Sequence, residues 1–193
     1  MGGAMVSRLI SAGYAVTIYS RTPSNATPLQ FQGSSPAELA ALSDVVFTMV
    51  GHSSDVKHVV MDTLLPSVNP NTVIIDHTSS HPALARQIYE SALEKHCDCV
   101  DAPVSEGDIG AIDGKLAIFA GGYKVVVEWL RPLFDVLGKA TYIGGDNAKV
   151  LPGAGLSKQL FSGMVANGDD KLGTQGIITV IERINASLIN ISL

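Results

Sequence analysis

Short apolar runs alternate with stretches of helical periodicity along most of the chain. Strands are expected where the runs are continuous or β-branched, and helices where apolar residues recur every three or four positions. The alternation predicts an α/β fold with a mostly parallel sheet and flanking helices. The expected strands are residues 15–19, 45–50, 73–76, 97–100, 116–120 and 140–143, and the expected helices are residues 3–12, 35–42, 56–64, 84–93 and 126–137.

Several helix ends are marked by their residues. Ser35 is expected to cap a helix whose first position is Pro36, because proline is tolerated where no intrahelical N–H bond is needed. The helix that begins near Val56 is expected to stop before Pro66.

The C-terminal part of the chain has a different pattern. Residues 144–155 are rich in Gly, Asp and Pro, as in a linker, and residues 156–165 and 174–184 are expected as two helices. Two such helices cannot form a domain by themselves. We therefore divide the chain into a domain of residues 1–145 and a junction with a short C-terminal helical remnant, residues 146–193.

Composition narrows the class of protein. The chain has 193 residues, 46% of them hydrophobic and 16% charged, and a net charge of −5. This is a core-forming composition, and it lacks the clustered basic patch that nucleic acid or an anionic membrane needs. No apolar run approaches the ~18 residues of a membrane helix, and no secretory signal is visible. We expect no nucleic-acid and no membrane partner.

The two cysteines, Cys97 and Cys99, have two interpretations. In a strand their sulfurs share one face, so together with His96 they could ligate a metal. Cysteines buried in a strand are much commoner, and no second pair completes a zinc site. We expect no metal site.

Polar loops follow the expected strands at Tyr19, Val50, Asp76 and Val104. In doubly wound sheets, ligands bind at the carboxyl ends of the strands. These loops are therefore the expected site.

Two features of the chain bear on whether the ligand is a dinucleotide. Gly2, at the start of the first helix, can be the last glycine of a G-x-G-x-x-G motif. Arg21 follows the strand at which an NAD site usually has an acidic residue, and its guanidinium can grip a 2′-phosphate. This favours NADP over NAD, although Arg21 can equally be a solvated surface residue.

Five segments of the chain match one family. They are residues 13–22, 35–38, 43–50, 76–82 and 101–107, the last of which reads D-A-P-V-S-E-G and is followed by Gly110-Ala111 and Gly114-Lys115-Leu116. They resemble the β-hydroxyacid dehydrogenases, which include 3-hydroxyisobutyrate dehydrogenase, glyoxylate/succinic semialdehyde reductase and 6-phosphogluconate dehydrogenase. The plant 3-hydroxyisobutyrate dehydrogenase-like proteins are the most similar in pattern. The resemblance implies a Rossmann-like sheet and NADP-dependent hydride transfer to or from a small hydroxy acid or aldehyde.

The resemblance also implies roles for single residues. Gly2 corresponds to the phosphate loop, and Val50, Gly51 and Asp55 to a cofactor-contacting loop and the helix turn after it. The remaining positions are Ser20, Arg21 and Thr22 for the adenosine phosphate, Thr78 and Ser79 for the nicotinamide ribose, and Ser105, Glu106 and Gly107 for the substrate carboxylate.

The sequence departs from the family at three places. It begins in a helix, so we expect a sheet truncated at the first strand. Glu106 replaces a glycine and puts a negative charge beside the expected carboxylate site. Lys149 is the only candidate for the catalytic lysine of the family, and Pro152 prevents the helix that should carry it.

Two function classes remain open. The first is an NADP-dependent oxidoreductase of this family, although the departures argue against full activity. The alternative is a non-catalytic nucleotide-binding or interaction module. Apolar positions in the last expected helix suggest a homo-oligomer, and the resemblance places the protein in the cytoplasm or the mitochondrion. The apolar positions are Ile177, Ile178, Val180, Ile181 and Ile184.

Overall fold

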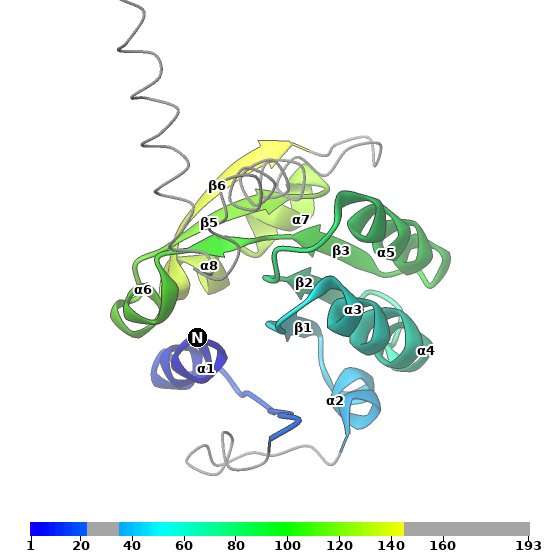
Figure 1. Cartoon of the computed structure of the whole chain (residues 1–193), viewed down its shortest axis with the longest axis horizontal. Helices are drawn as coiled ribbons and strands as arrows, with labels where there is room; N and C mark the ends of the chain where they lie inside the picture. The colour runs from blue at the N-terminus through cyan, green and yellow to red at the C-terminus, as the bar shows by residue number, and fades with distance from the viewer. Residues whose placement is uncertain (23–34, 145–193) are drawn as a thin grey trace, which may run out of the picture.

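The computed structural model describes residues 1–22 and 35–144. Its helices and strands alternate along the chain, as the apolar pattern predicts (Figure 1). The helical elements are α1 (Gly2–Ser11), α2 (Pro36–Leu42), α3 (Ser53–Val56), the π-helix η2 (Lys57–Leu64), α4 (Leu65–Ser67), α5 (Pro82–Glu94), α6 (Gly107–Asp113), α7 (Lys124–Trp129) and α8 (Arg131–Leu137). The strands are β1 (Val45–Thr48), β2 (Val73–Asp76), β3 (Asp98–Asp101), β4 (Val104–Ser105), β5 (Leu116–Gly121) and β6 (Gly138–Gly144).

The six described strands form one mixed sheet. β1, β2 and β3 run parallel, with Val45 opposite Val73 and Val73 opposite Asp98. β3 and β4 both lie antiparallel to β5, whose other edge carries β6 in parallel. The expected α/β fold with parallel strands and flanking helices is confirmed, with an antiparallel junction at β5 that the sequence pattern does not reveal.

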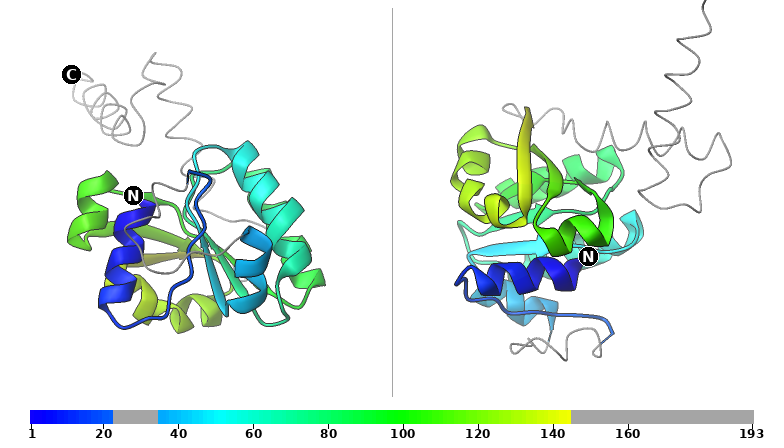
Figure 2. Two further views of the ribbon diagram at one scale, coloured as in Figure 1. Left: turned by 90° about the horizontal axis from the view of Figure 1, so that it is seen from below. Right: turned by 90° about the vertical axis from the view of Figure 1, so that its left-hand side faces the viewer.

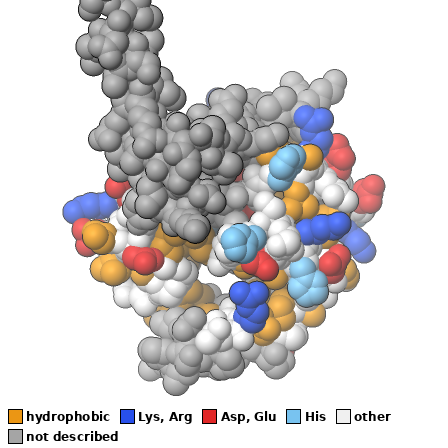
Figure 3. Space-filling model, viewed as in Figure 1, with side chains coloured by type: hydrophobic (Ala, Val, Ile, Leu, Met, Phe, Trp, Pro, Cys, Tyr) orange, Lys and Arg blue, Asp and Glu red, His pale blue; other side chains and the backbone are white. Residues whose placement is uncertain are grey.

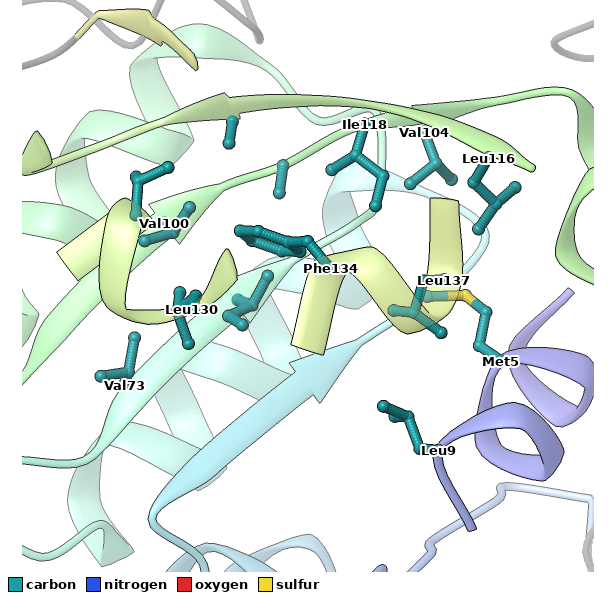
Figure 4. Close-up of a cluster of buried hydrophobic side chains, with 14 of the residues drawn as sticks. Met5, Leu9, Val73, Val100, Val104, Leu116, Ile118, Leu130, Phe134 and Leu137 are labelled. Atoms are coloured by element: carbon teal, nitrogen blue, oxygen red, sulfur yellow. The ribbon is translucent and has the colours of Figure 1, made fainter. Parts of the chain in front are cut away.

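Helices cover both faces of this sheet (Figure 2). Side chains alternate between faces along a strand, so Ile75 packs into one core and its neighbour Ile74 into the other. The first core lies against α1, α7 and α8, where Met5, Leu9 and Phe134 meet the sheet (Figure 4). The second lies against α2, η2 and α5.

The helix caps agree with the sequence. The Ser35 hydroxyl accepts a hydrogen bond from the Glu38 N–H at 3.1 Å, which caps α2 as expected. At α5, the His81 ring accepts one from the Ala83 N–H at 3.2 Å, and Pro82 takes the first helical position.

Close approach explains one glycine. A Cβ added at Gly138 would lie 2.0 Å from the Leu116 carbonyl oxygen. Only glycine therefore lets β6 begin against the first residue of β5.

Four expectations about elements are wrong. Residues 15–19 form no ladder strand and contribute a single bridge residue, Ile18. Extended backbone becomes a strand only when a neighbour completes its hydrogen bonds. The helix expected to stop before Pro66 runs through it to Ser67, partly as a π-helix.

The other two errors lie in the second half of the described chain. The single helix expected over 126–137 is two, α7 and α8, because Pro132 has no N–H to continue the helix across the junction at Leu130. The loop expected after Val104 instead holds β4 and α6.

Other expectations fall outside the described residues. These are the linker, the two C-terminal helices, the remnant of residues 146–193 and Lys149. Within residues 1–22 and 35–144, no helix is long and apolar enough to cross a bilayer.

Candidate functional site

A cavity of about 300 Å³ opens where the loops after β1 and β2 meet β4 and the start of α6. It lies at the carboxyl ends of β1 and β2, the position at which sheets of this kind bind ligands. Its lining residues are Met1, Met49, Val50, Gly51, His77, Thr78, Ser79, Val104, Gly107 and Asp108.

A buried carboxylate joins two of these loops. Asp76, the last residue of β2, accepts hydrogen bonds from the Thr48 hydroxyl at 2.8 Å and from the Thr78 N–H at 3.0 Å. The Thr78 hydroxyl in turn accepts one from the Val50 N–H at 3.1 Å. The loop after β1 is therefore held to the loop after β2 by a chain of hydrogen bonds.

Burial controls the chemistry of Asp76. Loss of hydration raises the pKa of its carboxyl, and the hydrogen bonds from Thr48 and Thr78 oppose that rise. These donors compensate the cost of burying an acid that forms no salt bridge with any of the described residues. Asp76 thus does not line the cavity, but its hydrogen bond to the Thr78 N–H holds a lining residue in place.

His77 is the most deeply buried ring of the site, with 1% of its surface exposed. Its Nδ1 lies 2.6 Å from the Ala102 carbonyl oxygen, which can only accept, so Nδ1 carries the proton. The ring stacks on Phe47 and meets the edge of Phe134. Burial lowers the pKa of His77 to about 4, so the ring is neutral and its Nε2, buried with no hydrogen-bond partner, is an acceptor.

Among the cofactor residues expected at the N-terminal end, Gly2 lies against a cavity-lining residue and Arg21 pairs with a residue of α3. A Cβ at Gly2 would stand 3.9 Å from the Met49 Cβ, so the first turn of α1 reaches the loop after β1. The Ser20 hydroxyl donates to the Thr22 carbonyl oxygen at 2.9 Å. Arg21 pairs with Asp55, its Nη1 lying 3.6 Å from Oδ1.

The residues expected to bind the substrate carboxylate occupy the start of α6. Ser105 pairs with Ala117 in the sheet, and Gly107 lines the cavity. Glu106 between them is exposed and has a φ of 83°, a left-handed conformation that glycine adopts without strain. Glu106 thus has a backbone conformation that suits glycine better, and it adds an exposed acidic group at the start of α6.

The structure brings together part of the expected set. Five expected residues line the cavity: Val50, Gly51, Thr78, Ser79 and Gly107. Ser105 and Glu106 precede Gly107 in the chain but do not line the cavity. The Arg21–Asp55 pair also lies outside the cavity. Five lining residues were not expected: Met1, Met49, His77, Val104 and Asp108. Met49 and His77 adjoin expected residues, but no local pattern shows that their loops meet.

The cysteines lie elsewhere. Cys97 and Cys99 are buried in the second core, and burial raises the pKa of the Cys99 thiol well above its usual value. Across the described ranges, no three His, Cys, Asp or Glu side chains are grouped to hold a metal ion.

Charged side chains of both signs are mixed on the face seen in Figure 3. Figure 3 shows acidic, basic and histidine side chains interspersed over the coloured part of the visible face. This part of the face has no single-sign patch.

The sequence of this domain matches that of a known protein family. The NAD binding domain of 6-phosphogluconate dehydrogenase aligns with residues 1–145. The chain belongs to this family. The resemblance to the β-hydroxyacid dehydrogenases is thereby confirmed, together with an NAD-binding Rossmann-like sheet.

Similar proteins indicate which type of dehydrogenase within the family this chain resembles. A probable 3-hydroxyisobutyrate dehydrogenase-like 3, mitochondrial, of Arabidopsis thaliana is 37% identical over 271 positions, covering 96% of this chain and 85% of its own. The alignment is longer than the chain, so a part of that relative has no counterpart here. A second Arabidopsis protein, probable 3-hydroxyisobutyrate dehydrogenase-like 1, mitochondrial, is 46% identical over 151 residues, 75% of this chain and 45% of its own.

A solved structure agrees in fold. The 3-hydroxyisobutyrate dehydrogenase of Mycobacterium tuberculosis, determined with L-serine, superposes with a TM-score of 0.75 and is 29% identical. The superposition covers 86% of this chain and 56% of that one. The chain is therefore of the 3-hydroxyisobutyrate dehydrogenase type, and it spans little more than half of that enzyme.

Proposed function

We propose that this chain binds NADP in preference to NAD, and that its function is hydride transfer between the nicotinamide and a small hydroxy acid or aldehyde. The substrate classes are those of the family: 3-hydroxyisobutyrate, glyoxylate or succinic semialdehyde. The observation that carries the proposal is the cavity between the loops after β1 and β2 and the start of α6, which brings expected cofactor and substrate residues together.

The residues present fit a nicotinamide nucleotide in three respects. Gly51 and Gly107 line the cavity without side chains, which leaves space for a ligand against the backbone. Thr78 and Ser79 offer hydroxyl groups for a ribose. The Arg21 side chain is 85% exposed, and its guanidinium is suited to a phosphate.

Each group then has a role. Ser20, Arg21 and Thr22 hold the adenosine phosphate, and Gly2 approaches the pyrophosphate. The loop of Val50 and Gly51, with Asp55 on the following helix turn, contacts the cofactor, and Thr78 and Ser79 approach the nicotinamide ribose. Ser105 and Gly107 receive the substrate carboxylate. The nicotinamide, when bound, supplies or accepts the hydride.

Turnover needs more than this site. A proton must reach the substrate oxygen from a group of suitable pKa and position, and Lys149 is our candidate for that group. Glu106 opposes an anionic substrate through its charge. The alternative function, a nucleotide-binding module without turnover, is favoured by this one residue.

The first experiment compares the melting temperature of the purified chain with saturating NADPH, with NADH and without nucleotide. A ligand that binds only the native state raises the melting temperature, because it increases the free energy of unfolding. The increase is about 2.7 kcal/mol at a ligand concentration 100 times Kd. We expect a larger rise with NADPH than with NADH, and loss of that difference in Arg21→Gln. No rise with either nucleotide would overturn the proposal.

Turnover assays with the three substrate classes separate the two functions. Oxidation of NADPH in the presence of an aldehyde supports the oxidoreductase. Nucleotide binding without turnover supports the module. The names of the Arabidopsis relatives lead us to propose a mitochondrial location, which imaging of the tagged protein in plant cells tests.

A further inference from the structure

The ion pair between Arg21 and Asp55 joins two loops at the edge of the candidate site. Arg21 follows the extended segment of residues 15–19, and Asp55 lies in α3 after β1. Arg21 is 85% exposed whereas Asp55 is 27% exposed. The pair therefore consists of a largely exposed guanidinium and a partly buried carboxylate.

Asp55 has the more constrained position of the two. Its backbone N–H donates to the His52 carbonyl oxygen at 3.0 Å in the first turn of α3. The start of this helix is also tied to α5, because the Ser53 hydroxyl accepts a hydrogen bond from the His81 N–H at 3.1 Å. Asp55 Oδ2 lies over Gly51, 3.5 Å from where a Cβ would be. Asp55 thus holds Arg21 beside a residue that lines the cavity.

The two charges have opposite effects on an adenosine ribose. A guanidinium donates two hydrogen bonds to a phosphate, whereas a carboxylate accepts from a ribose hydroxyl and repels a phosphate. A 2′-phosphate competes with Asp55 for the guanidinium, whereas a 2′-hydroxyl leaves the pair intact.

We propose that Asp55 is a specificity-determining residue, which holds Arg21 in an ion pair and thereby limits the preference for NADP over NAD. The inference rests on the proposed function, because it takes Arg21 as the group that receives the 2′-phosphate. It adds that the neighbouring carboxylate, and not Arg21 alone, sets the ratio of the two affinities.

The probes are 2′,5′-ADP, which carries the 2′-phosphate, and 5′-AMP, which lacks it. Calorimetric titration of the full chain gives Kd for each. The variants are Asp55→Asn, Asp55→Ser as a second test should the first fold poorly, Arg21→Gln, and Asp55→Asn combined with Arg21→Gln. The matched control is Asp62→Asn, which removes a carboxylate from another exposed pair, 3.4 Å from His58 Nδ1.

We expect Asp55→Asn to bind 2′,5′-ADP about fivefold more tightly than the unaltered chain, the size expected when an exposed ion pair is removed as a competitor. Its affinity for 5′-AMP should not rise, and Asp62→Asn should change neither value. In the Arg21→Gln background, the gain from Asp55→Asn should be smaller, because the pair is already absent.

Three results would overturn the inference. The first is equal affinity of Asp55→Asn and Asp62→Asn for 2′,5′-ADP. The second is an equal gain for both probes, which places the effect at the adenosine and not at the 2′-phosphate. In both cases binding of 2′,5′-ADP to the unaltered chain leaves the proposed function standing. If that chain binds neither 2′,5′-ADP nor NADPH, the proposed function fails and the inference fails with it.

Discussion

His77 couples the stability of this protein to pH. Its pKa falls from 6.5 to about 4 on folding, because burial disfavours the charged ring. Above pH 6.5 both states hold a neutral ring. Between these two values the unfolded chain binds a proton that the native chain does not, so the free energy of unfolding decreases as the pH falls.

The first prediction follows from this difference. The contribution of His77 decreases by about 1.4 kcal/mol per pH unit, about 3 kcal/mol in all. His77→Gln keeps an N–H for the Ala102 carbonyl oxygen and cannot titrate there, so it should flatten the profile. Urea denaturation from pH 7 to 4 measures this. His58→Gln, at an exposed position, should keep the original profile, and an equally steep profile in His77→Gln would refute the prediction.

Glu106 is a second residue whose effect is local. Its φ of 83° costs a side-chain-bearing residue about 1–2 kcal/mol, part of which glycine loses again through its greater entropy when unfolded. Glu106→Gly should therefore raise the free energy of unfolding by about 1 kcal/mol. Chemical denaturation checks it. Glu106→Ala removes the charge and keeps the strain, so a gain as large in that variant would assign the effect to charge.

At the scale of elements, the sheet brings the loops to one edge. Hydrogen bonds between the loops then fix their positions relative to each other. β1 and β2 are parallel neighbours, so their carboxyl ends meet at one edge of the sheet. The Thr78 hydroxyl then joins the two following loops through the Val50 N–H.

Removal of this hydroxyl should loosen both loops. Thr78→Val has nearly the same shape and leaves the Val50 N–H without its partner, a loss of about 1–3 kcal/mol in a buried setting. We expect lower stability and weaker NADPH binding together. Thr63→Val is the matched control, because that hydroxyl lies on a helix surface and contacts only the His58 carbonyl oxygen. Scanning and titration calorimetry on both variants measure the stability and the NADPH affinity. An unchanged NADPH affinity in Thr78→Val would contradict a role of the Thr78–Val50 hydrogen bond in binding.

At the scale of the whole molecule, two cores on opposite faces of one sheet support the candidate site at the carboxyl ends of its strands. The apolar stripe of residues 177–184 lies outside the described residues, and we expect it to mediate a homo-oligomer. Light scattering at micromolar concentration should give at least twice the chain mass of 20.2 kDa. Ile181→Asp should return the mass to that of one chain, and a monomeric mass for the unaltered chain would exclude this expectation.

Local signals determined much of this protein from its sequence alone. The apolar runs of β1, β2 and β5, the Ser35 cap and the position of the polar loops after the strands are short-range features, since each depends on neighbouring residues. The motifs in those loops also indicated the family. They could not establish a strand at residues 15–19, because a strand depends on a partner elsewhere in the chain.

The tertiary structure alone decided which loops meet and what their residues touch. The pairing of Arg21 with Asp55, the burial of His77 between two phenylalanines and the link from Val50 to Asp76 through Thr78 all join segments distant in sequence. Periodicity carries no information on such contacts. They arise when the parallel sheet brings the strand ends together and the two cores enclose the groups between them.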